Sequence, residues 1–376
     1  MQELDIFQEA GRQLGVCNAC RYCEGYCPVF RAIETRRDFQ QNDVFYLSNL
    51  CHDCRACYYA CMYTPPHEFG INIPKILAEA RSETYRRWSW PGFLAGAFRD
   101  RRITVYLAVG VTALVLALAL LLISPGILFT IHVGAGAFYE VVPYAAMMIG
   151  GLALSFYVIA VWLRSGARFW SETRSVLQER GGFKSLAAAI GAALGLRYLK
   201  GGGSGCFYPD DRPSSVRRIY HSLTFWGLLF DFVSTTLAFV YQDFFHRLPP
   251  YALTSAPVIF GALGGMGLMI GTGGLIWFKM QSDSEPAGAG APGMDYVFLI
   301  TLGLSALTGM LTLVLRATAA MGSILVLHLA LVAALFLTAP YGKFVHAIYR
   351  TLALIRYEIE RSQPAQHRGL SVPTFK

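Results

Sequence analysis

Charged residues are scarce in this chain: only 15% of its 376 residues are Asp, Glu, Lys or Arg, whereas 54% are hydrophobic. A water-soluble protein seldom combines so little charge with a positive mean hydropathy of +0.42. The N-terminal stretch MQELDIFQEAGRQLG is polar and contains acids, so it lacks the features of a secretory signal peptide. A dinucleotide fingerprint is also missing, because GGGSG at 201–205 follows no predicted strand. These absences exclude an ordinary soluble enzyme and indicate that any flavin belongs to a partner.

Two matching cysteine runs are the main feature that is present. Eight of the nine cysteines form them, as Cys17-x-x-Cys20-x-x-Cys23-x-x-x-Cys27-Pro28 and Cys51-x-x-Cys54-x-x-Cys57-x-x-x-Cys61. This is the ligand spacing of a two-cluster ferredoxin, in which the fourth cysteine of a run ligates the other cluster. We therefore predict one [4Fe–4S] cluster on Cys17, Cys20, Cys23 and Cys61, and a second on Cys27, Cys51, Cys54 and Cys57.

Disulfides and structural zinc are the alternatives for these cysteines. Disulfides need an oxidising compartment, and zinc prefers four ligands arranged as two separated pairs. The second run departs from the ferredoxin pattern, because Met62 rather than proline follows its last cysteine. Cys206 stands alone after the glycine run, and we leave it outside the cluster set.

Six apolar runs of about 20 residues, the length that crosses a bilayer, begin after residue 102. They are 103–123, 143–163, 219–241, 256–278, 295–315 and 322–344. Each is expected to be a helix, because lipid offers no hydrogen-bond partner to the backbone. The predicted fold class is all-α: an N-terminal helical two-cluster ferredoxin domain followed by a six-helix transmembrane bundle.

The chain divides by composition into four parts. We predict a cluster domain at 1–80, an interfacial linker at 81–102, a membrane domain at 103–345 with a large polar loop at 164–218, and a tail at 346–376 that is disordered after Arg361. Within the loop, 183–199 has the pattern of an amphipathic surface helix, and 282–294 (SDSEPAGAGAPGM) is expected to be flexible.

Lys and Arg counts predict the orientation in the membrane. The loop 164–218 carries ten of these residues and the segment 342–376 carries six, whereas 124–142 carries none and 242–254 and 316–321 carry one each. The positive side is cytoplasmic, so both termini are expected there, as in a multi-pass protein of the bacterial inner membrane. The net charge of +8 is explained by these loops and needs no nucleic acid.

Two histidines at the same predicted depth suggest a haem b. His221 lies near the start of the third span and His346 at the end of the sixth, both on the cluster side, and imidazole nitrogens ligate haem iron. Nearby cations that could neutralise haem propionates are Arg217, Arg218, Lys343 and Arg350. The alternative is that each histidine merely lies at the membrane interface or bonds a backbone carbonyl.

Further ionisable groups lie inside the spans, where they are functional by default. His328 precedes His346 by 18 residues, which places both on one face of a continuous helix about 27 Å apart and allows a second haem at His328. A second haem would need another ligand from a different helix. Asp231, ten residues after His221, is a poor haem ligand. Asp231 and His328 are therefore candidates for the proton partners of a quinone, and Asp231 alternatively pairs with the hydroxyl of Ser234 or Thr235. His132 and His246 are weaker haem candidates in outer loops.

Several motifs resemble those of one family. The stretch CHDCRACYYAC at 51–61 followed by PPHEF at 65–69, and GCFYP at 205–209 leading to His221, are similar to the tricarballylate-utilisation protein B family, also labelled citrate-utilisation protein B. The C-terminal half of CobZ-type oxidoreductases is similar as well. The resemblance covers nearly the whole chain. It implies an electron-transfer protein that reoxidises the FAD of a partner tricarballylate dehydrogenase and passes electrons to the quinone pool.

Spans three to six more distantly resemble the cytochrome b subunit of respiratory nitrate reductase. In that family a histidine pair on the last helix is also 18 residues apart, but a second histidine stands where this chain has Asp231. The order we predict is partner flavin, two clusters, haem b and quinone. The alternatives are a heterodisulfide-reductase-like thiol oxidoreductase subunit and a redox-sensing carboxylate transporter, which the glycine-rich fourth span allows.

Overall fold

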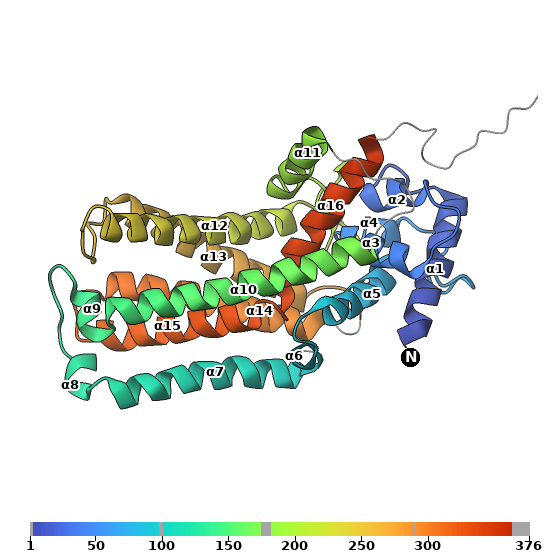
Figure 1. The fold of residues 1–376 in the computed structure, drawn as a ribbon. Coiled ribbons are helices and arrows are strands. Elements are labelled where there is room, and N and C mark those ends of the chain that lie inside the picture. Colours follow the sequence, from blue (N-terminus) through green and yellow to red (C-terminus); the bar gives the residue numbers. More distant parts are fainter. Residues whose placement is uncertain (1–2, 98–100, 174–181, 289–290, 363–376) are drawn as a thin grey trace, which may run out of the picture.

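The computed structural model describes residues 3–97, 101–173, 182–288 and 291–362, and it consists almost entirely of helices. A group of short helices lies at one end of a long bundle whose helices run side by side (Figure 1). Within the described residues, the strand pairing joins β1 (Cys206–Phe207) to β2 (Pro213–Ser214). The predicted all-α fold is therefore confirmed.

The short helices at the end of the bundle form what we call the cysteine domain, residues 3–88. Its helices are α1 (Glu3–Cys20), α2 (Pro28–Ile33), α3 (Gln41–Leu50), α4 (Ala56–Tyr59) and α5 (Ile73–Trp88). Residues at the N-terminal ends of several of these helices favour helix initiation. Pro28 opens α2 where its missing N–H is not needed. Gln40 and Asp43 form a capping box on α3, and the Asn72 side chain caps α5.

Six helices are long and apolar enough to cross a membrane, as predicted, and the chain is a multi-pass membrane protein. They are α7 (Arg101–Leu122), α10 (Tyr144–Glu172), α12 (Val216–Asp243), α13 (Ala256–Met280), α14 (Ala291–Val314) and α15 (Met321–Thr338). Shorter helices connect them: α6 (Gly92–Ala97), α8 (Pro125–Leu128), α9 (Ala137–Val141) and α11 (Phe183–Leu194), the last within the predicted amphipathic segment. The second span is longer than predicted and extends to Glu172.

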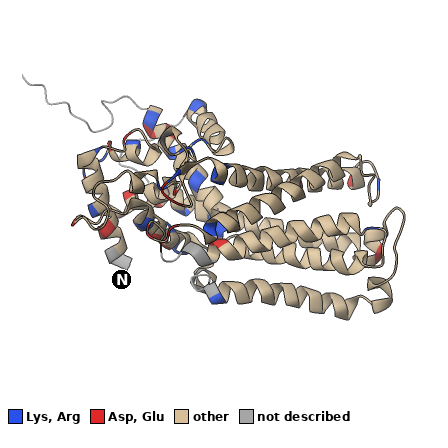
Figure 2. Cartoon of the chain, turned by 180° about the vertical axis from the view of Figure 1, so that it is seen from behind, with Lys and Arg blue, Asp and Glu red and all other residues tan. Residues whose placement is uncertain are grey.

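Charged side chains gather at the cysteine-domain end of the molecule, whereas the spans are almost free of them (Figure 2). Few charges lie at the opposite end of the bundle. The asymmetry of Lys and Arg along the sequence therefore becomes an asymmetry between the two ends of one bundle.

The last predicted span, 322–344, is wrong at its C-terminal end. Helix α15 ends at Thr338, and the chain passes Pro340 and the 3₁₀ turn η2 (Lys343–Val345) before α16 (His346–Ser362) begins. Proline has no N–H to donate to the preceding turn and its ring clashes with the carbonyl four residues earlier, so the helix stops here. His328 and His346 consequently lie on two helices, and the prediction that they share one face of a continuous helix is wrong.

Helix α16 belongs to the core of the cysteine domain. The ring of its Tyr349 packs against Trp88 of α5 at 5.1 Å and Phe169 of α10 at 5.8 Å, measured between centroids. All three rings are buried. The segment predicted to be a tail therefore joins the cysteine domain to the bundle through its first 17 residues, and residues 363–376, predicted to be disordered, lie outside the described part.

The loop before α14 also holds the cysteine domain. The Tyr59 hydroxyl donates to the Asp283 carboxylate at 2.8 Å, and Arg55 donates to the Asp283 carbonyl at 3.0 Å. Asn72 donates to the carbonyl of Glu285 at 2.8 Å. The part of this segment that the structure describes, 282–288, is therefore tied down, in contrast to the predicted flexible loop.

A buried ion pair joins α16 to the cysteine domain. Arg36 contacts Glu360 at 2.7 Å, and the two side chains are only 9% and 7% exposed. Arg36 also pairs with Asp43 at 2.7 Å. Because a buried charge loses its solvation and depends on its partners, removing one partner leaves an uncompensated charge.

Glu360→Gln is expected to destabilise this packing by about 3 kcal/mol, since among the described residues Arg36 would keep Asp43 as its one carboxylate partner. The shift of the denaturation midpoint of the solubilised protein, followed by near-UV circular dichroism, measures the effect. Glu9→Gln is the matched control: Glu9 pairs with Arg12 on α1, and the two side chains are 32% and 46% exposed, so its loss should cost less than about 1 kcal/mol. Equal shifts of the denaturation midpoint in both variants would contradict a stabilising role of the buried ion pair.

Glycines bring α12 and α13 into close contact along their length. A Cβ at Gly227 would lie 2.9 Å from the carbonyl oxygen of Gly264, and one at Gly267 would lie 3.2 Å from that of Leu223. Small residues let membrane helices approach until their backbones touch. The glycine-rich fourth span is thus one continuous packed helix, Ala256–Met280.

Candidate functional site

The first group of cysteines surrounds a hollow beside the C-terminal end of α1. Cys17 and Cys20 lie in the last turn of that helix, and the chain then turns through Arg21, whose φ of 55° is in the left-handed region. This turn brings Cys23 back toward Cys17, and Cys61 reaches the same hollow from beyond α4. The four cysteines that the sequence assigned to one cluster therefore line one hollow.

The second group surrounds an adjacent hollow. Cys27 stands just before α2, Cys51 ends α3, and Cys54 and Cys57 bracket the start of α4. All four line this second hollow. The chain wraps around it through Asp53 and Arg55, which have φ values of 52° and 62°, a conformation that non-glycine residues adopt only where surrounding contacts impose it. The four cysteines predicted to hold the second cluster thus line one hollow, and Cys57 among them lines the first hollow as well.

Several thiols line each hollow together. Among the described residues, no group of three His, Cys, Asp or Glu side chains that could hold a single metal ion is found. Burial, followed by the nearby Cys61, Cys23 and Cys20 thiols, raises the pKa of Cys17 to about 12. Coordination by iron would remove these protons outright.

Cys206, which we left outside the cluster set, lies beside the second hollow. It is fully buried and packs in one apolar cluster with Cys54. Its thiol donates to the carbonyl of Leu199 at 3.2 Å, and the backbone N–H of Phe207 donates to the carbonyl of Cys54 at 2.9 Å. The signal in the sequence was the GCFYP motif, whose packing beside Cys54 only the fold reveals.

The carbonyl of Cys51 joins the second hollow to the membrane domain. Arg81 of α5 and Arg350 of α16 both donate to it at 2.6 Å. Arg350 lies one turn after His346, so a ligand position of the second group and the start of α16 share a direct hydrogen bond. His52, the neighbour of Cys51, bonds the carbonyl of Leu50 through Nδ1 at 2.8 Å.

The structure brings His221 and His346 together from α12 and α16. Their ring centroids are 6.2 Å apart and the rings are perpendicular, at 89°. A ligating histidine nitrogen lies about 2 Å from a first-row metal, and its ring centroid lies about 1 Å further back, so two axial rings on one iron have centroids about 6 Å apart. The centroid distance of the histidine pair therefore matches the distance expected for two axial ligands of one iron.

The second nitrogen of each ring differs in its surroundings. His346 Nδ1 lies 2.6 Å from the carbonyl of Lys343, a contact that would hold the ring in place and leave Nε2 for a metal. Burial, followed by the cationic Lys343 and Arg350, holds the pKa of His346 well below its usual range, which keeps the ring neutral. His221 Nδ1 is buried and has no hydrogen-bond partner among the described residues.

The four predicted propionate partners differ in their availability. Lys343 pairs with Asp295 at 2.9 Å. Arg217 donates to the carbonyl of Asp53, and Arg218 donates to the carbonyl of Gly195 at 3.2 Å. The Nε of Arg350 is buried without a partner among the described residues. Of the four, only Arg350 thus has a buried donor nitrogen without a partner among the described residues.

The other membrane residues that we singled out lie apart from this pair. His328 directs Nδ1 at the hydroxyl of Thr308 and the carbonyl of Ser305, both on α14, at 3.2 and 3.0 Å. The Asp231 carboxylate occupies the place that a Cβ at Gly264 would take. No contact joins His328 to Asp231 within the described residues, and their roles toward a quinone stay predictions.

Neither hydroxyl that we considered as a partner of Asp231 is directed at its carboxylate. Ser234 donates to the carbonyl of Pro257, and Thr235 donates to the carbonyl of Asp231. His132 is hydrogen-bonded through Nδ1 to the Glu140 carboxylate at 2.5 Å and through Nε2 to the carbonyl of Ile127 at 2.8 Å. His246 lies in the loop after α12 with a φ of 53°.

Comparison with known proteins identifies close relatives of the chain. A family model described as "Citrate utilization protein B" matches residues 96–367, and one described as "Citrate utilization protein B Fer4-like domain" matches residues 10–87, which contain both cysteine runs. The chain is 42% identical over 361 residues to a protein named "Citrate utilization protein B" from Escherichia coli, across 95% of this chain and 93% of that protein. No solved structure matches.

Proposed function

The chain belongs to the citrate utilization protein B family, and from this premise we propose that it is a membrane electron carrier. It takes electrons from the reduced FAD of a partner dehydrogenase, a tricarballylate dehydrogenase by resemblance, and gives them to a membrane quinone. Two [4Fe–4S] clusters and a haem b, when bound, supply the one-electron chemistry. The two cysteine groups hold the clusters, and His221 and His346 hold the haem.

The observation that carries this proposal is the order of the three sites. The first hollow reaches the surface, where Cys20 is exposed and Met62 is 67% exposed beside it. The second hollow lies deeper, since Cys51 and Cys54 are each 8% exposed. Cys57 lines both hollows. This difference in exposure supports an order of exposed first group, buried second group and histidine pair.

Contacts between the second hollow and the histidine pair support the same order. Arg350 connects the carbonyl of Cys51 to the first turn of α16, which begins at His346. Electron transfer weakens steeply with distance, so a carrier needs its sites in close sequence. A rigid connection at this point keeps the second cysteine group and the haem ligands at a constant separation.

The orientation follows from the charge distribution. We place the cysteine domain and both ends of the chain on the cytoplasmic face of the bacterial inner membrane, because Lys and Arg are retained on that side. Figure 2 shows the charged end that would face the cytoplasm. Thiols stay reduced in that compartment, as cluster assembly requires.

The alternative functions gain no support from the fold. A transporter site usually lies at broken helices near midplane, whereas the glycine-rich α13 is continuous and packed against α12. A thiol oxidoreductase needs a cysteine that its substrate can reach. Cys206, which stands outside the two runs, is 0% exposed.

Reduced flavoprotein added to inside-out membrane vesicles is expected to reduce the haem of this protein, because the cysteine domain would face the added donor. A quinone analogue should then reoxidise it. The absorbance of reduced haem b measures both steps. Right-side-out vesicles are the control and should respond only after they are made permeable. Haem that stays oxidised with every flavoprotein donor would contradict the proposed function.

A further inference from the structure

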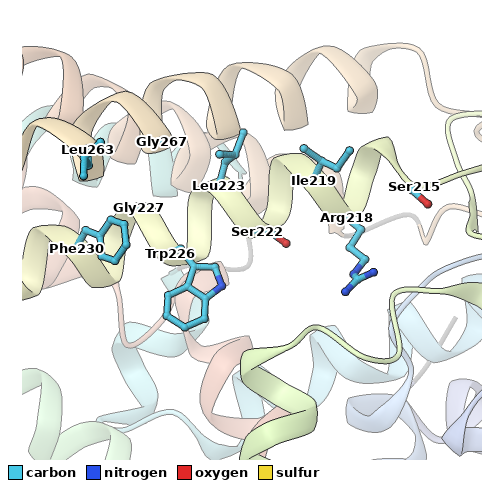
Figure 3. Close-up of a pocket in the computed structure, with 10 residues that line it drawn as sticks. All are labelled: Ser215, Arg218, Ile219, Ser222, Leu223, Trp226, Gly227, Phe230, Leu263 and Gly267. Atoms are coloured by element: carbon cyan, nitrogen blue, oxygen red, sulfur yellow. The ribbon is translucent and has the colours of Figure 1, made fainter. Parts of the chain in front are cut away.

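A groove runs along the outer face of α12 beside α13, within the membrane-spanning region (Figure 3). The residues that line the groove expose mostly apolar surface to it. The residues that line it are Ser215, Arg218, Ile219, Ser222, Leu223, Trp226, Gly227, Phe230, Leu263 and Gly267.

The groove changes from polar to apolar along its length. Ser215, Arg218 and Ser222 lie at the end nearest the cysteine domain, and Trp226, Phe230 and Leu263 continue into the span. Hydrogen-bond donors therefore stand at the membrane boundary, while aromatic and aliphatic side chains extend inward. A ligand that fits has a compact polar head with acceptor oxygens and a long apolar tail.

The groove and the histidine pair lie on different faces of the same helix. Ser215, Ser222 and Trp226 recur at helical spacing and so share one face of α12. His221 turns to another face, where it meets His346 of α16. Because Ser222 directly follows His221, only the thickness of one helix separates them, about 10 Å with side chains.

We propose that this groove binds the membrane quinone that accepts the electrons, an inference that rests on the proposed function. Ser222 and Arg218 donate hydrogen bonds to the quinone oxygens, Trp226 and Phe230 pack on its flat ring, and the tail follows Leu263 into the lipid. The quinone takes up two electrons, delivered singly from the side of His221, and two protons from water at the Ser215 end. The product is the quinol.

The shape favours a quinone over an anionic phospholipid, the other ligand with a polar head and an apolar tail. A phosphate head group prefers a cluster of cations, and Arg218 is the one cation that lines the groove. Two aromatic side chains, in contrast, suit a conjugated ring.

Filling the groove tests the proposal. An azido derivative of a short-chain ubiquinone, photolysed with the full-length protein in lipid nanodiscs, should label peptides within 215–230. Leu263→Phe narrows the groove and is expected to lower labelling, and the rate at which the same analogue reoxidises the haem, by about tenfold. Trp226→Leu removes a ring contact and should lower both in the same direction.

Ile259→Phe is the matched control. Ile259 lies one turn before Leu263 on α13, is 45% exposed where Leu263 is 48%, and does not line the groove. This variant should stay within about twofold of the wild type. Haem content and haem reduction by the flavoprotein should be unchanged in all three variants.

The outcomes separate the inference from the function on which it rests. If quinones reoxidise the wild-type haem but all variants behave alike, or if labelling maps near His328, the groove is not the quinone site. If Leu263→Phe loses co-purifying anionic phospholipid and keeps its quinone labelling, the groove is a lipid site. A wild-type haem that no quinone reoxidises would instead refute the proposed function.

Discussion

Alanine at His221 or at His346 is expected to abolish the low-spin haem b spectrum of the purified protein. The centroids of the two rings lie 6.2 Å apart and the ring planes are perpendicular. Under the proposed function, each ring would supply one axial nitrogen to the same iron. A single axial histidine does not maintain a six-coordinate low-spin iron, and the loss should therefore be nearly complete in either variant. The visible spectrum of the dithionite-reduced protein, with the haem quantified as the pyridine hemochrome, measures it.

His328→Ala is the control, because it removes the same side chain from a neighbouring span. His328 is bonded to α14, and the structure pairs its ring with no second histidine among the described residues. The haem signal should remain in this variant. Loss of haem in His328→Ala together with its retention in His221→Ala would show that the ligand pair is a different one.

Anaerobically purified protein should contain about eight non-haem irons per chain, and Cys54→Ser should lose about half of them. Cys54 lines the second hollow with three other cysteines, and a serine hydroxyl is a much poorer ligand for iron than a thiolate. Cys17→Ser should have the same effect on the first cluster. Iron analysis and the EPR spectrum of the reduced protein check both results.

Cys206→Ser is the matched control for the clusters. Its thiol is buried in the same apolar cluster as Cys54, yet it donates to the carbonyl of Leu199 rather than lining the hollow. Iron content should stay at the wild-type value in this variant. Zinc in place of iron, without an EPR signal from a reduced cubane, would contradict the two-cluster assignment altogether.

The architecture could be predicted from the sequence because it depends on short-range patterns. The length of an apolar run specifies a span, and all six predicted spans are present as helices. The spacing within each cysteine run depends on the local turns around one cluster, and the family resemblance drawn from these motifs is confirmed by the matching family models. The end of α15 was missed, although Pro340 marked it, because the apolar run continues past the break.

The sequence by itself therefore determined the helical class, the number of spans, the location of charge and the two cysteine groups, since each is encoded in neighbouring residues. Only the tertiary structure decided that α16 packs into the cysteine domain, that Arg350 bonds the carbonyl of Cys51, and that Cys206 lies beside Cys54. It also decided that glycines draw α12 and α13 together beside a groove. These features join residues far apart in the chain. Their contacts depend on packing and burial of whole helices, which no local pattern records.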